Sequence, residues 1–207
     1  QISSADLVLP KTVTIGSAGA EDTKLVFDGN AQDYHVGLDD SADSLTIGLG
    51  STLGTTSHMV FDANGHITKP LQPAFMIYLS TDQNNFALNS NVTVAFDEER
   101  FDQNNDFASN TFTAPVTGKY QLNLMLRLNS ADTGASYYQV KIKTSNDNYS
   151  SLIAVNFTSD PNYIPINASV LADMDANDTA SVEVFQSGGS QQTDVSPNSF
   201  FSGFLAC

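Results

Sequence analysis

The chain has 207 residues, of which 41% are hydrophobic, and its 23 acidic and 8 basic residues give a formal net charge of −15. Such a chain is large enough for one ordinary hydrophobic core and a smaller second module, so it is globular and not disordered. The negative charge repels nucleic acid and anionic bilayers, and no apolar run approaches the ~20 residues that cross a membrane. The single Cys207 excludes a disulfide framework within one chain.

The segment before Pro70 is a series of short alternating pieces separated by Gly and Asp turns. Leu25-Val26-Phe27-Asp28-Gly29-Asn30 recurs as Met59-Val60-Phe61-Asp62-Ala63-Asn64-Gly65, which indicates a repeated β unit. Large apolar side chains are too sparse in this segment for an independent core. We therefore expect several chains to intertwine here around a common axis.

The prolines of Lys69-Pro70-Leu71-Gln72-Pro73 hold the chain extended and separate a β-rich shaft, residues 1–72, from a head, residues 73–207. In the head almost every element alternates with a period of two, and the turns are rich in Asn, Asp, Gly and Ser, which is typical of an all-β protein. One long strand carries its apolar residues on a single face, at Tyr120, Leu122, Leu124, Leu126 and Leu128. Short strands at this spacing predict a sandwich or a barrel.

The last predicted strand, 199–205, carries aromatic residues on both faces. Side chains alternate along a strand, so Phe201 and Leu205 point one way while Phe200 and Phe204 point the other. An uncovered face would leave each phenylalanine in water, at a loss of about 1.5–3 kcal/mol. We therefore expect one face to pack in the subunit core, and Phe200 and Phe204 to lie in a trimer interface.

Four stretches carry a resemblance to a known family: Ala74-Phe75, Val94-Ala95-Phe96-Asp97, the run from Asn110 to Tyr120, and Phe201-Ser202-Gly203-Phe204-Leu205. In their order and spacing they resemble the globular-head jelly roll of the C1q/TNF-like superfamily, over nearly all of residues 73–207. The resemblance implies a ten-stranded jelly-roll sandwich that assembles as a homotrimer. It also implies that both termini of the head lie at its base and that variable loops lie at the opposite apex.

The shaft resembles the neck repeats of bacteriophage tail fibres, above all in the run from Gly37 to Gly48. No collagen-like Gly-X-Y tract precedes the head, which disfavours a vertebrate complement-type architecture. A fibre with a head at its tip implies a trimeric virion protein that attaches to host-surface glycan. The alternative is a secreted or surface-anchored bacterial adhesin, or a subunit of an extracellular filament.

Asp102-Gln103-Asn104-Asn105-Asp106 spaces oxygen donors at alternate positions, and Asp173-Met174-Asp175-Ala176-Asn177-Asp178 does likewise. Such oxygens are the hard ligands that calcium takes, so Asp102, Asn104 and Asp106 are candidate ligands. Neither loop has the glycine of an EF-hand. The alternative interpretation is a solvated turn, because Asp and Asn favour turns through their own side-chain hydrogen bonds.

Tyr149 and Tyr163 lie near Asn and Asp residues in predicted loops, where an exposed ring can stack on a sugar. The loops around Asn146–Ser150 and Asp160–Tyr163 are therefore expected at the free end of the head, as the glycan-binding surface. Three such sites on one axis gain avidity by a factor of about 10²–10⁴.

Catalytic patterns are weak, and we expect no enzyme. None of the three histidines, His35, His58 and His66, belongs to a recognisable group of nucleophile, base and carboxylate. A polysaccharide-degrading enzyme would need two carboxylates facing a groove, for which the run Asp97-Glu98-Glu99 is the only dense acidic segment at a strand end.

Overall fold

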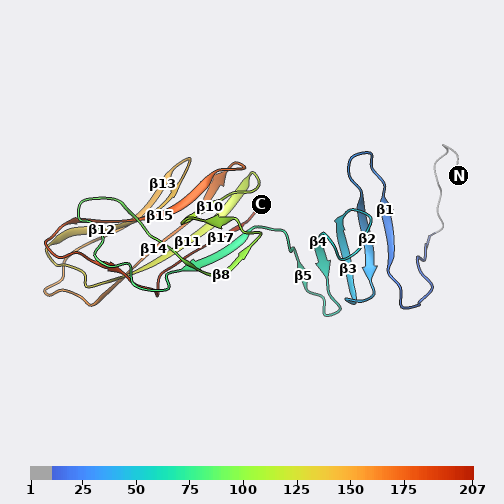
Figure 1. Ribbon diagram of the computed structural model, residues 1–207, viewed down its shortest axis with the longest axis horizontal. Helices are drawn as coiled ribbons and strands as arrows, with labels where there is room; N and C mark the ends of the chain where they lie inside the picture. The colour runs from blue at the N-terminus through green and yellow to red at the C-terminus, as the bar shows by residue number, and fades with distance from the viewer. Residues whose placement is uncertain (1–10) are drawn as a thin grey trace. The chain divides into compact units, whose positions relative to one another are not determined.

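The computed structural model describes residues 11–207 as an all-β protein in two units, one that ends at Leu71 and one from Gln72 to Cys207 (Figure 1). Within the described residues there is no helix that is long and apolar enough to cross a membrane. Each unit has its own hydrogen-bonded sheets.

The N-terminal unit is one antiparallel sheet in which strands that are consecutive along the chain lie next to each other, in the order β1-β2-β3-β4-β5 (Figure 1). The strands are β1 (Thr23–Phe27), β2 (Tyr34–Asp39), β3 (Ser44–Leu49), β4 (Ser57–Phe61) and β5 (Ile67–Thr68). Strands β1 and β4 are the two copies of the repeated sequence, and each ends at a phenylalanine followed by an aspartate.

Strand pairing in this unit corrects the expectation of intertwined chains. Each described strand pairs with its neighbour in the same chain, and short turns such as Asp40–Asp43 connect them. A short turn brings adjacent strands together at little loop-closure entropy, so pairing within the chain competes well with pairing between chains. The sparse apolar content that suggested intertwining instead leaves this sheet without a conventional core.

The head is a sandwich of two six-stranded sheets. One sheet has the order β13-β12-β15-β10-β9, with β7 on β15, and the other has the order β14-β11-β17-β6-β8, with β16 on β11. The bounds are β6 (Ala74–Tyr78), β7 (Val92–Thr93), β8 (Glu98–Gln103), β9 (Phe107–Ala108), β10 (Thr111–Thr113), β11 (Gly118–Asn129), β12 (Ala135–Thr144), β13 (Asn148–Ala154), β14 (Tyr163–Met174), β15 (Thr179–Gly188), β16 (Asp194–Val195) and β17 (Phe200–Leu205).

The described residues of the head thus form twelve strands where ten were expected. Ten of them make up the two continuous paths, and the other two, β7 and β16, are two-residue strands that pair beside them. The sandwich architecture itself is confirmed. Two-residue strands carry no alternation that a sequence pattern can reveal, which explains the difference.

The core of the head lies between the sheets and is centred on aromatic rings. Phe75 of β6 stacks on Phe112 of β10, with ring centroids 4.6 Å apart, and meets Phe201 of β17 edge-on at 5.2 Å. The predicted apolar face of β11 is buried throughout, from Tyr120 to Leu128. The alternation read from the sequence therefore identified the side of this strand that faces the core.

The two ends of the head differ. At one end, the base, the Leu205 N–H donates to the Pro73 carbonyl at 3.0 Å and the Lys119 N–H donates to the Cys207 carbonyl at 2.7 Å. The head's termini therefore lie together. The opposite end, the apex, contains the β11–β12, β13–β14 and β15–β16 connections, at 130–134, 155–162 and 189–193.

Candidate functional site

The outward surface of the sheet β14-β11-β17-β6-β8 is rich in apolar side chains that have no cover within the subunit. Phe204 is 47% exposed, while Phe201 on the same strand is fully buried. Phe204 pairs with Gln121 of β11, which in turn pairs with the exposed Leu171 of β14. We call this surface the aromatic face and define it by Phe101, Met125, Leu171, Phe200 and Phe204.

A closed polar network lies at the centre of the aromatic face. The Gln121 Nε2 donates to Ser169 Oγ at 2.9 Å and to Asn123 Oδ1 at 3.2 Å, and Ser169 Oγ donates to Asn123 Oδ1 at 2.8 Å. Polar groups can be buried at low cost only when they are hydrogen-bonded. Because Gln121 Nε2 and the Ser169 hydroxyl already donate within the network, a partner can cover these two groups without leaving them without a hydrogen bond.

The outward surface of the other sheet is polar and charged. Lys143 Nζ donates to Glu183 Oε1 at 2.8 Å, and Lys141 Nζ donates to Asn91 Oδ1 at 2.6 Å. Such side chains are depleted from the centres of protein interfaces. The contrast between the two surfaces makes the aromatic face, which includes Phe200 and Phe204, the candidate surface for association.

The structure separates the two tyrosines that were expected at one end of the head. Tyr149 lies in β13 beside the 145–147 turn, which is tied to the base because Asn146 Nδ2 donates to the Asp173 carbonyl at 3.1 Å. Its side chain is half-buried against the core. The expectation that Asn146–Ser150 belongs to the free end is therefore wrong, because the β12–β13 hairpin turns at the base.

Tyr163, in contrast, begins β14 at the apex and is 60% exposed. The Arg127 guanidinium lies over its ring, 4.7 Å from the centroid. Arg127 also donates from Nε and Nη2 to Ser196 Oγ, at 3.1 and 2.8 Å. Tyr163 is thus held as a rigid ring at the apical edge of the aromatic face. No sequence pattern singled out Arg127 or Ser196, because these two residues meet only when β11 pairs with the β16 segment.

Buried and exposed carboxylates hold the apical loops together. Asp132 is buried and accepts hydrogen bonds from the backbone N–H groups of Gln191, Gly134 and Ser190 at 2.7, 2.6 and 2.6 Å. These three donors lower the pKa of Asp132. Asp160 accepts from both the hydroxyl and the N–H of Thr133, which lowers its pKa as well. These hydrogen bonds tie the apical loops to one another.

We predict that the apex loosens in acid. A carboxylate whose folded pKa is lowered stabilises the fold above its unfolded pKa of about 3.9, and that contribution is lost as the pH falls through the folded value. Asp132→Asn has no carboxyl group to titrate, so it should lower the amide protection factors of Ser190 and Gln191 already at pH 7 and remove most of their further fall in acid. Protection factors of both amides in the unsubstituted protein that stay constant between pH 7 and pH 3 would contradict this role for Asp132.

The predicted calcium loop is organised as a turn. Asp102 Oδ1 accepts from the Asp106 N–H at 3.1 Å and Asp102 Oδ2 accepts from the Phe107 N–H at 2.9 Å. Asn104 adopts a positive φ of 86°, as asparagine does in turns. Among the described residues there is no group of three or more His, Cys, Asp or Glu side chains that could hold a metal ion. With both Asp102 oxygens bonded to backbone donors, the loop fits the solvated turn better than calcium.

Asp106 provides a direct test of these two interpretations. Burial, and then the nearby charge of Asp102, raise the pKa of Asp106, so its ionised form costs stability at neutral pH. If the loop is a turn, Asp106→Asn should raise the melting temperature at pH 7, and calcium and magnesium at equal ionic strength should have the same effect on the unsubstituted protein. A larger shift with calcium that Asp106→Asn removes would instead establish a calcium site.

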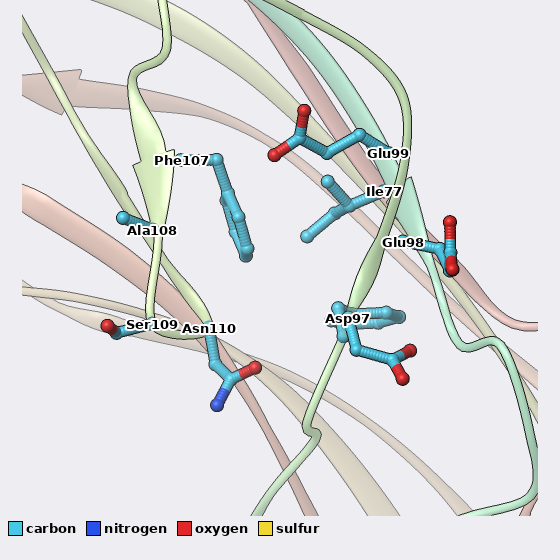
Figure 2. A pocket seen from close by; sticks show the side chains of 9 residues that line it. Ile77, Asp97, Glu98, Glu99, Phe107, Ala108, Ser109 and Asn110 are labelled. Atoms are coloured by element: carbon cyan, nitrogen blue, oxygen red, sulfur yellow. The ribbon is translucent and has the colours of Figure 1, made fainter.

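A cleft of about 220 Å³ lies at the edge between β8 and β9 and includes the acidic run Asp97-Glu98-Glu99 (Figure 2). The three carboxylates point in different directions, and Phe107 and Ile77 line the cleft beside them (Figure 2). Asp97 accepts from the Ser80 hydroxyl at 2.6 Å and from its N–H at 2.8 Å, which lowers the pKa of Asp97. A general acid needs a raised pKa, so the lowered pKa of Asp97 disfavours this residue as the acid of a glycosidase pair.

A two-sheet β sandwich with joined termini, one polar outer surface and one aromatic outer surface defines a jelly-roll head. Residues 74–206 match the sequence model of the C1q domain, and the chain therefore belongs to the C1q-domain family. Proteins of this family are often trimeric, commonly bind ligands and are generally extracellular. The resemblance of the head to C1q-type jelly rolls is thus confirmed.

Among solved structures, the globular domain of the zebrafish complement 1qA protein is similar to this chain, with 16% sequence identity and a TM-score of 0.47. The similarity covers 66% of this chain and 98% of that domain. No curated protein matches the chain significantly. The likeness of the N-terminal unit to phage fibre necks remains a prediction.

Proposed function

We propose that the protein is a homotrimeric, non-enzymatic attachment protein whose C1q-type head binds host-surface glycan, and that it forms the tip of a virion tail fibre. The aromatic face is the observation that carries the proposal. It offers apolar side chains around a polar network whose members hydrogen-bond to one another, so that three copies can meet there around one axis.

The apical loops supply the ligand-binding part of the proposal. Tyr163 lies at the apical edge of the aromatic face, where neighbouring copies would meet, and its exposed ring offers a stacking surface for a sugar. Arg127 and Ser196 hold that ring in place, so little conformational entropy is lost on binding. Weak single sites suit an attachment protein, because three sites on one axis gain avidity on a dense receptor by a factor of about 10²–10⁴.

The tail-fibre assignment rests on the N-terminal unit. A small antiparallel sheet rich in Gly and Asp turns precedes the head, and the part of the chain that the structure describes contains no collagen-like Gly-X-Y tract. The unit and the head are joined by the proline-containing segment 69–73, which is a stiff connector. A bacterial adhesin with the same head is the competing assignment, and adjacent virion genes would decide between them.

Replacing Tyr163 by alanine should reduce binding of the labelled, purified trimer to host cells by at least about tenfold, because three weakened sites lose avidity together. Leu152→Ala is the matched control, since Leu152 is equally exposed but lies on β13 in the opposite sheet. Cell binding should be measured alongside mass by light scattering. Undiminished binding of a trimeric Tyr163→Ala protein would remove the apical site from the proposal.

A further inference from the structure

The N-terminal sheet has one face that is apolar and uncharged. Directly paired residues form rows across it: Leu25, Val36, Ile47 and Met59 in one row, Thr23, Leu38, Leu45, Phe61 and Ile67 in a second, and Phe27, Tyr34 and Leu49 in a third. Leu38 and Leu45 are 45% and 42% exposed, and Leu25, Phe27, Tyr34 and Ile67 are exposed to a similar degree. We call these twelve residues the apolar face.

The opposite face of the same sheet is polar and is closed by the chain itself. His35 is fully buried there, and its Nδ1–H donates to the Gly50 carbonyl at 2.9 Å. Leu53, from the loop between β3 and β4, packs over Gly37, where a Cβ would come within 2.9 Å of the leucine methyl group. The unit thus covers its polar face and leaves its apolar face exposed. A sheet that is stable on its own usually buries the apolar face and exposes the polar one.

We infer that the apolar face is a second self-association surface, which packs against the same face of other copies of this chain. The inference rests on the proposed trimer, because the head would bring the copies together. The N-terminal unit is acidic, with nine Asp and Glu residues against three Lys up to Leu71, yet the apolar face has no charged residue. Copies can therefore meet at this face without placing like charges opposite each other.

The size of the face favours a tethered copy over an independent partner. Four strands spaced by about 4.8 Å and each about 17 Å long, with the two-residue β5 beside them, give a face of roughly 350 Å². A stable complex between separate proteins buries about 800 Å² on each partner. This face alone is too small to capture a free protein firmly. A copy held through the 69–73 connector needs a much smaller buried area for stable association. The reason is that a short tether raises its effective concentration to the millimolar range.

A shallow hollow strengthens the case for interlocking side chains. It has a volume of about 320 Å³ and is lined mainly by apolar groups, including Ile15, Leu25, Val36 and Leu38. A flat sheet surface would offer little to fix the register of a partner. A hollow beside protruding side chains allows the side chains of two copies to interdigitate, as they do between the packed sheets of a β sandwich.

Thiol protection in the full chain tests the inference. In a Cys207→Ser background, Leu38→Cys places the only thiol on the apolar face, and Leu45→Cys repeats the test on the paired residue of β3. Ala42→Cys is the matched control, since Ala42 lies in the exposed β2–β3 turn. We expect the native Leu38→Cys protein to react with a maleimide at least about tenfold more slowly than Ala42→Cys, because thiol reactivity requires access.

The same samples are measured by light scattering, so that the inference and the proposed function can fail separately. Slow reaction of both face variants in a trimer supports the inference. Rates equal to that of Ala42→Cys in a trimer would overturn it and leave the trimeric head intact. A monomeric mass would overturn both proposals, whatever the rates. Adding Phe204→Glu should restore fast reaction of Leu38→Cys, and protection that persists in the resulting monomer would also overturn the inference.

Discussion

Replacing Phe201 by alanine is expected to lower the free energy of unfolding of the head by about 3–5 kcal/mol. Phe201 is fully buried at the centre of β17, which is itself flanked by β11 and β6, and its ring packs on Phe75 and Phe96. The substitution would leave a cavity between the two sheets that no neighbouring strand can close. Because small domains are stable by only about 5–15 kcal/mol, this single change removes a large fraction of the total.

Thermal and urea unfolding followed by circular dichroism would measure the loss. Phe204→Ala is the matched control, because it removes the same ring from the same strand on the opposite side, where Phe204 is about half exposed. We expect Phe204→Ala to lower the free energy of unfolding of the isolated subunit by less than about 1 kcal/mol. Equal losses for the two variants would mean that both faces of β17 are buried within one subunit, contrary to the structure.

Placing a charge on the aromatic face is expected to abolish the trimer. Phe204→Glu would bring three carboxylates into a desolvated interface, and each buried unpaired charge costs several kcal/mol. Because Phe204 contributes little to the subunit's own core, the monomer should remain folded. Light scattering at micromolar concentration would report a fall to the mass of one chain, while the circular dichroism spectrum stays β-rich.

Leu152→Glu provides the control for this charge, because Leu152 is a similarly exposed apolar residue on the opposite sheet. It should leave the trimer unaffected. Leu171→Glu, from the neighbouring strand β14 of the aromatic face, should reproduce the Phe204→Glu result. A trimer that survives both Phe204→Glu and Leu171→Glu would place the interface elsewhere and remove the main support for the proposed function.

The pattern of alternation predicted the head well because burial there follows the strand period. The β11 residues Tyr120 and Leu128 are both fully buried, as their positions on one side of the strand required. The same rule separated Phe201 from Phe204, and the structure places them on opposite sides of β17. Strands of only two residues, as in β7 and β16, show no alternation, and the ten strands implied by the family resemblance do not include them.

The candidate site was less predictable, because its geometry depends on contacts between residues that are distant along the chain. Tyr149 and Tyr163 look alike in sequence, yet the hairpin of β12 and β13 turns at the base while β14 begins at the apex. Arg127 stacks on Tyr163 and bonds to Ser196, and no local motif links these three residues. Asp102 was read as a cation ligand from its spacing, and only the structure shows that its oxygens accept backbone N–H groups.

The sequence by itself determined the all-β class, the boundary near the 69–73 prolines and the core-facing side of the long strands, because each of these follows from local backbone preferences and side-chain alternation. The tertiary structure alone decided which loops share an end of the head and which sheet surface is apolar. It also decided that the N-terminal strands pair within their own chain. These features depend on which strands become neighbours, and strand order is set by the packing of the whole sandwich.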